Sequence, residues 1–180
     1  MLLLPLLALA GCSELTRASK KFAKPWEPRL HSLFNDSTDV CSPWAPSQEP
    51  WAVREHELIA RRSLEADIVA LGEIREVVDT LSGAKIRQAV LQFEVSEMLR
   101  GTRPDLTDGA TRITLVVSNS EDPNVAKRMI RRKAILYLRW LKTDDPPFRW
   151  HLTCVTEGVT ALARRHLRGR AKKEAKELPD

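Results

Sequence analysis

The sequence has little glycine and lacks the short motifs that mark common enzyme active sites. Only 7 of its 180 residues are glycine, and it contains no Walker loop, dinucleotide fingerprint or G-x-S-x-G elbow. His56-Glu57 begins like the zinc-protease motif HExxH, but position 60 is Ala60, so the second ligand is missing and His56 is predicted to be a surface residue. No two of the four histidines have the spacing of metal ligands (His31, His56, His151 and His166). We therefore expect a protein that is not an enzyme and that holds no metal and no cofactor.

The N-terminal apolar run, residues 1–10, is too short to cross a bilayer, which takes about 20 apolar residues. It has the length of the hydrophobic region of a signal peptide. It ends in Leu9-Ala10-Gly11-Cys12, which resembles the lipobox of bacterial lipoproteins. That resemblance implies export, acylation of the Cys12 thiol with chains such as palmitate, cleavage before Cys12, and acylation of the new amino terminus.

The same resemblance predicts where the protein resides. Two or more acyl chains hold a protein stably on a membrane, whereas one chain holds it only marginally. Ser13 follows the cysteine, and a residue other than aspartate at this place resembles a sorting pattern for the outer membrane. We expect a lipid-anchored protein of the bacterial cell envelope, on the outer rather than the inner membrane and facing the periplasm.

Cysteine is scarce, with three residues in the chain: Cys12, Cys41 and Cys154. An odd number leaves one cysteine unpaired in an exported protein. Acylation of Cys12 accounts for that residue and leaves Cys41 and Cys154 as a candidate disulfide, which an oxidising compartment permits. Such a bond would join the segment around Cys41 to the last strand of the expected sheet.

A β-hairpin is predicted at the centre of the chain. It consists of two long strands, Asp67–Thr80 and Lys85–Leu99, joined by a tight turn near Ser82-Gly83. The second strand alternates apolar and polar residues, which is typical of a strand with one face on a core (Ala89, Leu91, Phe93 and Val95). Gly72 in the middle of the first strand predicts a bulge or a sharp bend. A bent strand of this kind suits a small closed barrel.

Shorter segments complete the predicted fold. Three of them alternate as strands do: Arg112–Ser118, Ala134–Lys142 and Phe148–Val155. Gly158–Leu162 is a candidate closing strand, Val125–Lys133 a candidate basic helix, and Trp51–Leu64 a helix with an apolar stripe. The prediction is a mainly β fold, a small five-stranded OB-like barrel with an N-terminal helix and a basic C-terminal helical tail.

Composition divides the chain into four regions. These are a signal peptide (1–11), a lipidated proline-rich tether (12–50), the barrel domain with its N-terminal helix (51–162) and a basic tail (163–180). Prolines and polar clusters are typical of a tether. Aromatic residues such as Trp26 and Phe34 are unusual in disordered segments. We therefore expect part of the second region to pack on the domain.

Three segments resemble the barrels of the netrin module and the metalloproteinase inhibitors, which are of the OB type: Ala66–Gly72, Phe93–Gly101 and Ile135–Leu141. The resemblance covers roughly Ala66–Val155 and implies a five-stranded barrel used for binding rather than catalysis. Those inhibitors place the amine of an N-terminal cysteine on the protease zinc. Here Cys12 would be acylated and distant from the barrel, so no functional residue of that family is carried over.

Positive charge is concentrated in two places. The formal net charge is +5 and the pI is about 9.3, while seven cations against three acids place +4 in Arg164–Asp180. A second cluster is a candidate patch for an anionic partner: Lys127, Arg128, Arg131, Arg132 and Lys133. The expected partners are the membrane, through the lipid, and either another envelope protein or an anionic lipid or glycan.

These observations predict a cell-envelope lipoprotein with a non-enzymatic binding or structural role. One alternative is an OB-type protein that binds single-stranded nucleic acid if the export signal is not real, with Tyr137, Trp140 and Trp150 as stacking rings. Alternation places most of these rings in the core, and an exported protein meets little nucleic acid, so we do not expect that partner. The other alternative is an envelope hydrolase with an unrecognised site.

Overall fold

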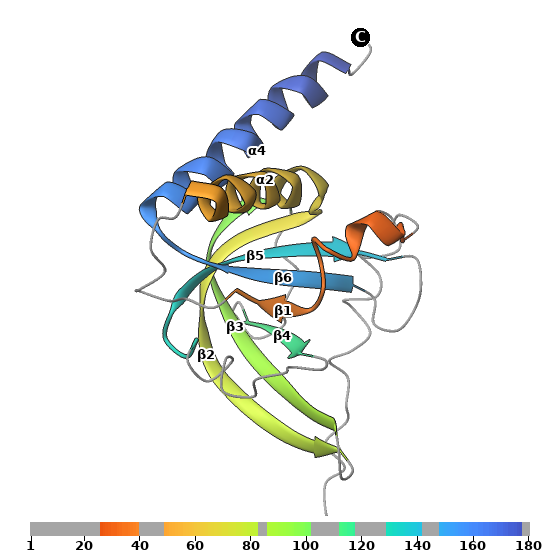
Figure 1. The fold of residues 1–180 in the computed structure, drawn as a ribbon, viewed down its shortest axis with the longest axis vertical. Helices are drawn as coiled ribbons and strands as arrows, with labels where there is room; N and C mark the ends of the chain where they lie inside the picture. Colours follow the sequence, from red (N-terminus) through yellow and green to blue (C-terminus); the bar gives the residue numbers. More distant parts are fainter. Residues whose placement is uncertain are drawn as a thin grey trace, which may run out of the picture.

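The computed structural model describes residues 26–39, 49–82, 86–101, 112–117, 129–141 and 148–177. These residues form one curled mixed sheet with the shape of a half-barrel, and two α-helices lie together on one side of it (Figure 1). The elements follow in this order: the 3-10 helix η1 (Pro28–Leu30), β1 (Ser37–Thr38), α2 (Glu49–Glu65), β2 (Ile68–Ser82), β3 (Ile86–Arg100), β4 (Arg112–Val117), β5 (Lys133–Trp140), β6 (Phe148–Cys154) and α4 (Glu157–Glu177).

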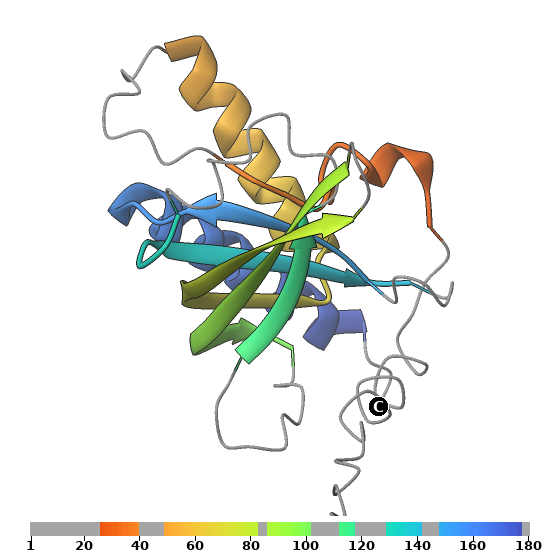
Figure 2. The same ribbon diagram turned by 90° about the horizontal axis from the view of Figure 1, so that it is seen from below.

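The strand order in the sheet is β1-β6-β5-β2-β3-β4. The short strand β1 runs parallel to β6, and the other neighbours are antiparallel. The β2–β3 hairpin is the longest unit, and its strands curve through the sheet (Figure 2). The two long antiparallel strands predicted at the centre of the chain are therefore confirmed, and the turn predicted near Ser82-Gly83 falls on residues 83–85, outside the described residues.

Gly72 lies at an irregularity in the pairing of β2 with β3. The pairing of β2 with β3 changes register between Leu71 and Gly72, as in a β-bulge. A Cβ atom at position 72 would lie 2.7 Å from the ring of Phe93 and would also collide with the backbone oxygen of Glu94. Only glycine lets the two strands approach so closely here, which confirms the bulge predicted at this residue.

The sheet is buried on both faces near its centre. The inner face carries one apolar cluster, which includes Leu91 and Phe93 of β3 and Leu136 and Leu138 of β5. The other face packs against the helices in a second cluster, which includes Tyr137 of β5. The alternation predicted for β3, β4, β5 and β6 is confirmed, and β5 is covered on both faces along nearly its whole length.

The sheet has six strands in the described part of the chain, so the prediction of five was wrong. The additional strand, β1, belongs to the segment predicted as tether. Its two residues are polar and too few to give any periodic signal. Just before it, Leu30, Leu33 and Phe34 are buried in the cluster under the helices, so the expectation that part of this region packs on the domain is confirmed.

The predicted closing strand at Gly158–Leu162 was also wrong, because these residues begin α4. Thr156 caps the helix, since its Oγ1 accepts a hydrogen bond from the backbone N–H of Val159 at 3.2 Å. Val159, Ala163 and Leu167 are buried at helical spacing. Neither helix in the described residues is long and apolar enough to cross a membrane.

Candidate functional site

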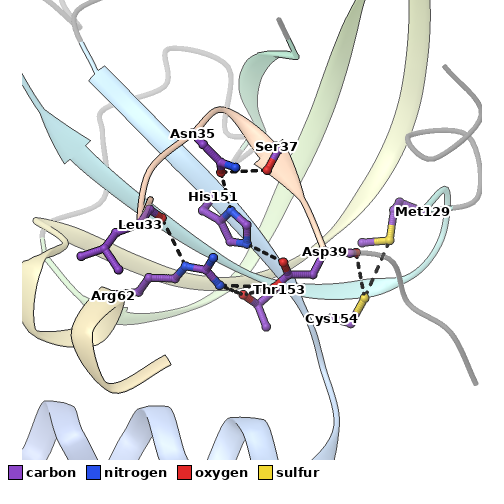
Figure 3. A network of polar contacts seen from close by, with 9 residues as sticks. All are labelled: Leu33, Asn35, Ser37, Asp39, Arg62, Met129, His151, Thr153 and Cys154. Carbon is purple, nitrogen blue, oxygen red and sulfur yellow. Dashed lines mark hydrogen bonds and ion pairs between the residues drawn. The ribbon is translucent and has the colours of Figure 1, made fainter. Parts of the chain in front are cut away.

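A network of buried polar side chains joins three elements that are distant in the sequence (Figure 3). Asp39 follows β1, Arg62 lies on α2, and His151 and Thr153 lie on β6. One carboxylate oxygen of Asp39 is 2.9 Å from Nε2 of His151. The other oxygen accepts a hydrogen bond from Oγ1 of Thr153 at 3.0 Å and from Nη1 of Arg62 at 3.3 Å. Arg62 is 4% exposed and His151 2%, whereas the Asp39 side chain is 35% exposed.

The same network holds the backbone that precedes β1. Nε of Arg62 donates a hydrogen bond to the carbonyl oxygen of Leu33 at 3.2 Å. Nδ1 of His151 is 2.9 Å from Oδ1 of Asn35, which also accepts a hydrogen bond from Ser37 at 2.7 Å. The segment between η1 and β1 is thus fixed from both the helix side and the strand side (Figure 3).

Burial and neighbouring charge set the ionisation of the network. Burial lowers the pKa of His151; the Asp39 carboxylate raises it and Arg62 lowers it further, and the result lies below the usual value. Burial alone would raise the pKa of Asp39, but His151, Arg62 and Thr153 outweigh it and hold that pKa below the usual range. At neutral pH the network is therefore an ionised carboxylate, a guanidinium and a neutral imidazole. A neutral imidazole carries one N–H, so the ring can donate a hydrogen bond to only one of these two oxygens, Oδ1 of Asp39 or Oδ1 of Asn35.

A second ionic contact holds the other side of β1. Asp36 forms an ion pair with Arg149 and accepts a hydrogen bond from the backbone N–H of Trp150 at 3.0 Å. Its own N–H donates to the carbonyl oxygen of Trp150 at 2.9 Å. Burial raises the pKa of Asp36, and the contacts of Arg149 and Trp150 act against that rise. Asp36 has φ of 53°, in the left-handed region that Asp tolerates better than most residues.

Arg139, a buried cation, closes the junction between α2 and β2. The guanidinium of Arg139 on β5 donates a hydrogen bond to the carbonyl oxygen of Glu65, at the end of α2, and lies 3.7 Å from a carboxylate oxygen of Asp67. The second oxygen of Asp67 accepts a hydrogen bond from the backbone N–H of Trp140 at 2.9 Å. These contacts satisfy a helix terminus and are structural.

An Asp–His contact can also serve acid–base catalysis, so its geometry here is informative. In a catalytic pair the carboxylate holds one ring nitrogen and the other nitrogen faces a nucleophile or substrate. In His151 both ring nitrogens face side chains of this protein, Asp39 on one side and Asn35 on the other. The ring is almost completely buried. His151 therefore has no ring nitrogen directed toward a substrate, and the arrangement acts as a clamp.

The structure describes only some of the residues that the sequence singled out. Cys12, Cys41, Lys127 and Arg128 lie outside the described residues. The sulfur of Cys154 lies 3.3 Å from the carbonyl oxygen of Asp39 and 3.9 Å from the sulfur of Met129 (Figure 3).

The rest of the candidate anionic-partner patch lies at the start of β5. Arg131, Arg132 and Lys133 are exposed. The backbone N–H of Arg131 donates to the carbonyl oxygen of Ile74 at 2.8 Å, and Arg131 has φ of 60°. The described part of the candidate basic helix at Val125–Lys133 is a turn that leads into β5, so a helix through position 133 was a wrong prediction.

The aromatic rings considered for base stacking lie in the two cores. Tyr137, Trp140 and Trp150 are all buried, and the rings of Trp140 and Phe148 meet edge to face at 5.5 Å. A buried ring cannot stack on a nucleic-acid base, so these three residues form no binding platform. His56 is exposed on α2, as predicted. Within the described ranges, no three His, Cys, Asp or Glu side chains gather as they would around a metal ion.

The sequence analysis missed the clamp residues, although a signal for one of them was present. Arg62 lies three positions after Ile59 and four before Ala66, both of which are buried, so helical spacing places it on the packed face of α2. His151 and Thr153 alternate with Trp150 and Leu152, which assigns them to the opposite face of β6. That face is polar in sequence but covered in the fold, and no local pattern indicates the covering.

The sequence matches no protein-family model, and no curated protein matches it.

Proposed function

We propose that this protein is a lipid-anchored protein of the bacterial cell envelope with a non-enzymatic binding or structural role. Support for the anchor is the sequence Leu9-Ala10-Gly11-Cys12 at the end of an apolar run of signal-peptide length. The observation that carries the non-enzymatic role is the Asp39–His151 contact, in which each ring nitrogen of His151 lies 2.9 Å from a side-chain oxygen of this protein, Oδ1 of Asp39 or Oδ1 of Asn35.

The proposal includes an OB-like barrel. The five strands β6-β5-β2-β3-β4 are neighbours in that order, and β1 lies on the outer edge of β6. Closing the sheet would therefore bring β4 toward the edge formed by β1 and β6. The bend at Gly72 in the central strand β2 supports this geometry. The role assigned to the barrel is the presentation of an outer surface, since its inner face is filled by apolar side chains.

A disulfide between Cys41 and Cys154 is part of the same proposal. Support comes from the sulfur of Cys154, which lies 3.3 Å from the backbone oxygen of Asp39. Cys41 follows Asp39 by two residues, and two residues reach at most about 7 Å. The bond would close the same segment that the Asp39 network holds.

The test is the intact mass of the protein isolated from its own membranes, measured with and without reductant. The expected mass corresponds to a chain that begins at Cys12 and carries acyl chains, with a gain of two hydrogen atoms on reduction. A mass that retains Met1 and carries no lipid would remove the anchor. A peptide map without a Cys41–Cys154 peptide under non-reducing conditions would remove the disulfide and leave the anchor intact.

A further inference from the structure

Helix α4 carries a row of cations on the side opposite to its packed face. Val159, Ala163 and Leu167 form the packed face, and all three are buried against the sheet and α2. At 100° per residue, positions 165 and 168 lie nearly opposite that face. Arg165 and Arg168 are both exposed, as this geometry requires.

The row continues along the helix. The backbone of α4 remains helical to Glu177, so Lys172 and Lys176 follow Arg168 at spacings of four residues. Each step turns only about 40° around the helix, which keeps these positions on the side opposite to the packed face. We define the basic row as these four positions: Arg165, Arg168, Lys172 and Lys176. Eleven residues at 1.5 Å each give it a length of about 16 Å. The second half of α4 extends past α2 and away from the sheet (Figure 1).

The acidic residues of α4 do not compensate this row locally. Charges on a helix neutralise each other mainly at spacings of three and four residues. Glu174 lies four residues after Arg170, and Glu177 lies four residues after Lys173. Glu157, Glu174 and Glu177 all lie at other spacings from every member of the basic row. The cation nearest the sheet outside the row, Arg164, is already paired with Glu97, with Nη2 at 2.7 Å and 2.9 Å from its two carboxylate oxygens.

We propose that the basic row of α4 binds the anionic headgroups of a phospholipid surface. This inference rests on the proposed function, because the anchor at Cys12 would keep the domain beside such a surface. Cys12 and the first described residue, Trp26, are 14 residues apart, which limits their separation to roughly 50 Å. A short tether of this kind raises the effective concentration of the headgroups to the order of millimolar.

The character of the helix favours headgroups over the other polyanions. The large apolar residues exposed in the described chain are Leu64, Val78, Val116 and Ile130, and none of them is on α4. The helix therefore lies on a charged surface without inserting into it. Single-stranded nucleic acid, in contrast, is held by exposed aromatic rings beside the cations, and the candidate rings here are buried.

The test is co-sedimentation of the unacylated chain with vesicles. The chain starts at residue 12 and carries C12S, so that neither lipid nor apolar leader contributes and every described residue is kept. Vesicles of phosphatidylglycerol and phosphatidylcholine are compared with pure phosphatidylcholine in low salt. We expect binding to the anionic vesicles alone, and loss of that binding as salt rises.

The variant R165Q/R168Q tests the row, and R61Q/R112Q is the matched control, because it removes the same charge from exposed positions on α2 and β4. Each cation near an anionic surface strengthens binding about fivefold. The first variant should bind more than tenfold more weakly than the parent chain, and the control should bind within about threefold of it. Equal binding by both variants would overturn the proposal, because any loss of binding would then follow from the net charge and not from the position of the cations on α4. If an oligonucleotide displaced the chain from vesicles at a lower concentration than the free headgroup does, the row would be assigned to nucleic acid instead.

The lipid anchor and the role of the basic row are refuted by different results. An acylated Cys12 in the native protein, together with unchanged vesicle binding by R165Q/R168Q, would remove only the role of the basic row. An unacylated native protein whose isolated chain still needs Arg165 and Arg168 for vesicle binding would remove only the anchor.

Discussion

Replacing Arg62 by methionine tests whether the buried network holds the segment before β1 on the domain. The substitution keeps the apolar stem and removes three hydrogen bonds, to the carbonyl oxygen of Leu33, the carboxylate of Asp39 and Oγ1 of Thr153. The control is R61M, which removes the same charge from the neighbouring, exposed position of α2. Loss of a side chain with such contacts and 4% exposure should lower the stability of the fold far more than loss of a side chain in water.

The magnitude follows from the exposure of the partners. Removing one partner of a fully buried ion pair costs about 3–5 kcal/mol. Asp39 is 35% exposed and keeps His151 and Thr153 as partners, so water and these groups recover part of that cost. The carbonyl oxygen of Leu33 loses its donor in a buried position, which costs about 1–3 kcal/mol. We expect R62M to lower the free energy of unfolding by roughly 2–4 kcal/mol, and R61M by about 0.5 kcal/mol or less.

Two measurements check this result. Urea unfolding followed by tryptophan fluorescence gives the global effect, with a midpoint lowered by about 1 M or more for R62M. Hydrogen exchange gives the local effect at the amides of Asp36 and Asp39, which donate to the carbonyl oxygens of Trp150 at 2.9 Å and Leu152 at 2.8 Å. These two amides should lose protection before those of β5. An R62M protein with the unfolding midpoint of R61M and unchanged exchange at both amides would refute the reasoning.

Three further results are expected. The fold lowers the pKa of His151, so the unfolded chain binds the proton first as pH falls. The stability that the neutral ring contributes is therefore present above about pH 6.5 and lost below it. Urea midpoints measured from pH 8 to 5 should fall more steeply for the parent chain than for H151Q. G72A should destabilise the protein by more than about 2 kcal/mol because its Cβ collides with β3, whereas G169A, at a position with nothing within 4 Å, should stabilise α4 by about 0.5–1 kcal/mol in thermal unfolding; destabilisation by G169A would contradict the account. If the proposed disulfide is present, C41S should lower the unfolding free energy by about 2–4 kcal/mol under oxidising conditions and have little effect with reductant, and an equal effect in both conditions would exclude the bond.

Local sequence patterns predicted the sheet well where the type of residue at a position is enough to determine how that position packs. The alternation in β3 and β4 and the glycine at position 72 are signals of this kind, and the structure confirms them. The alternation in Ala134–Lys142 also predicted the strand that the structure shows as β5. These features depend on neighbours along the chain, so a single sequence carries them.

The parts that sequence reasoning missed depend on contacts between distant segments. Ser37 and Thr38 show no strand pattern, and they become β1 only because His151 and Leu152 lie beside them. Helical spacing from Ile59 and Ala66 places Arg62 on the packed face of α2. Its polar partners, in contrast, come from Leu33 and Asp39, which are 23 or more residues away. Charged residues in such a position are interpreted as solvent-exposed until their partners are known.

The charged clamp explains how a strand of two residues can have a defined register. The register of a long strand is fixed by its alternating faces, since a slip of one residue exposes every apolar side chain. A two-residue polar strand has no such penalty. Here Asp36, which precedes β1, and Asp39, which follows it, supply that penalty. Asp36 pairs with Arg149, and Asp39 contacts Arg62 and His151. A slip of one residue would leave two carboxylates partly buried without their cations, which costs several kcal/mol. Residues 26–39 therefore belong to the folded domain.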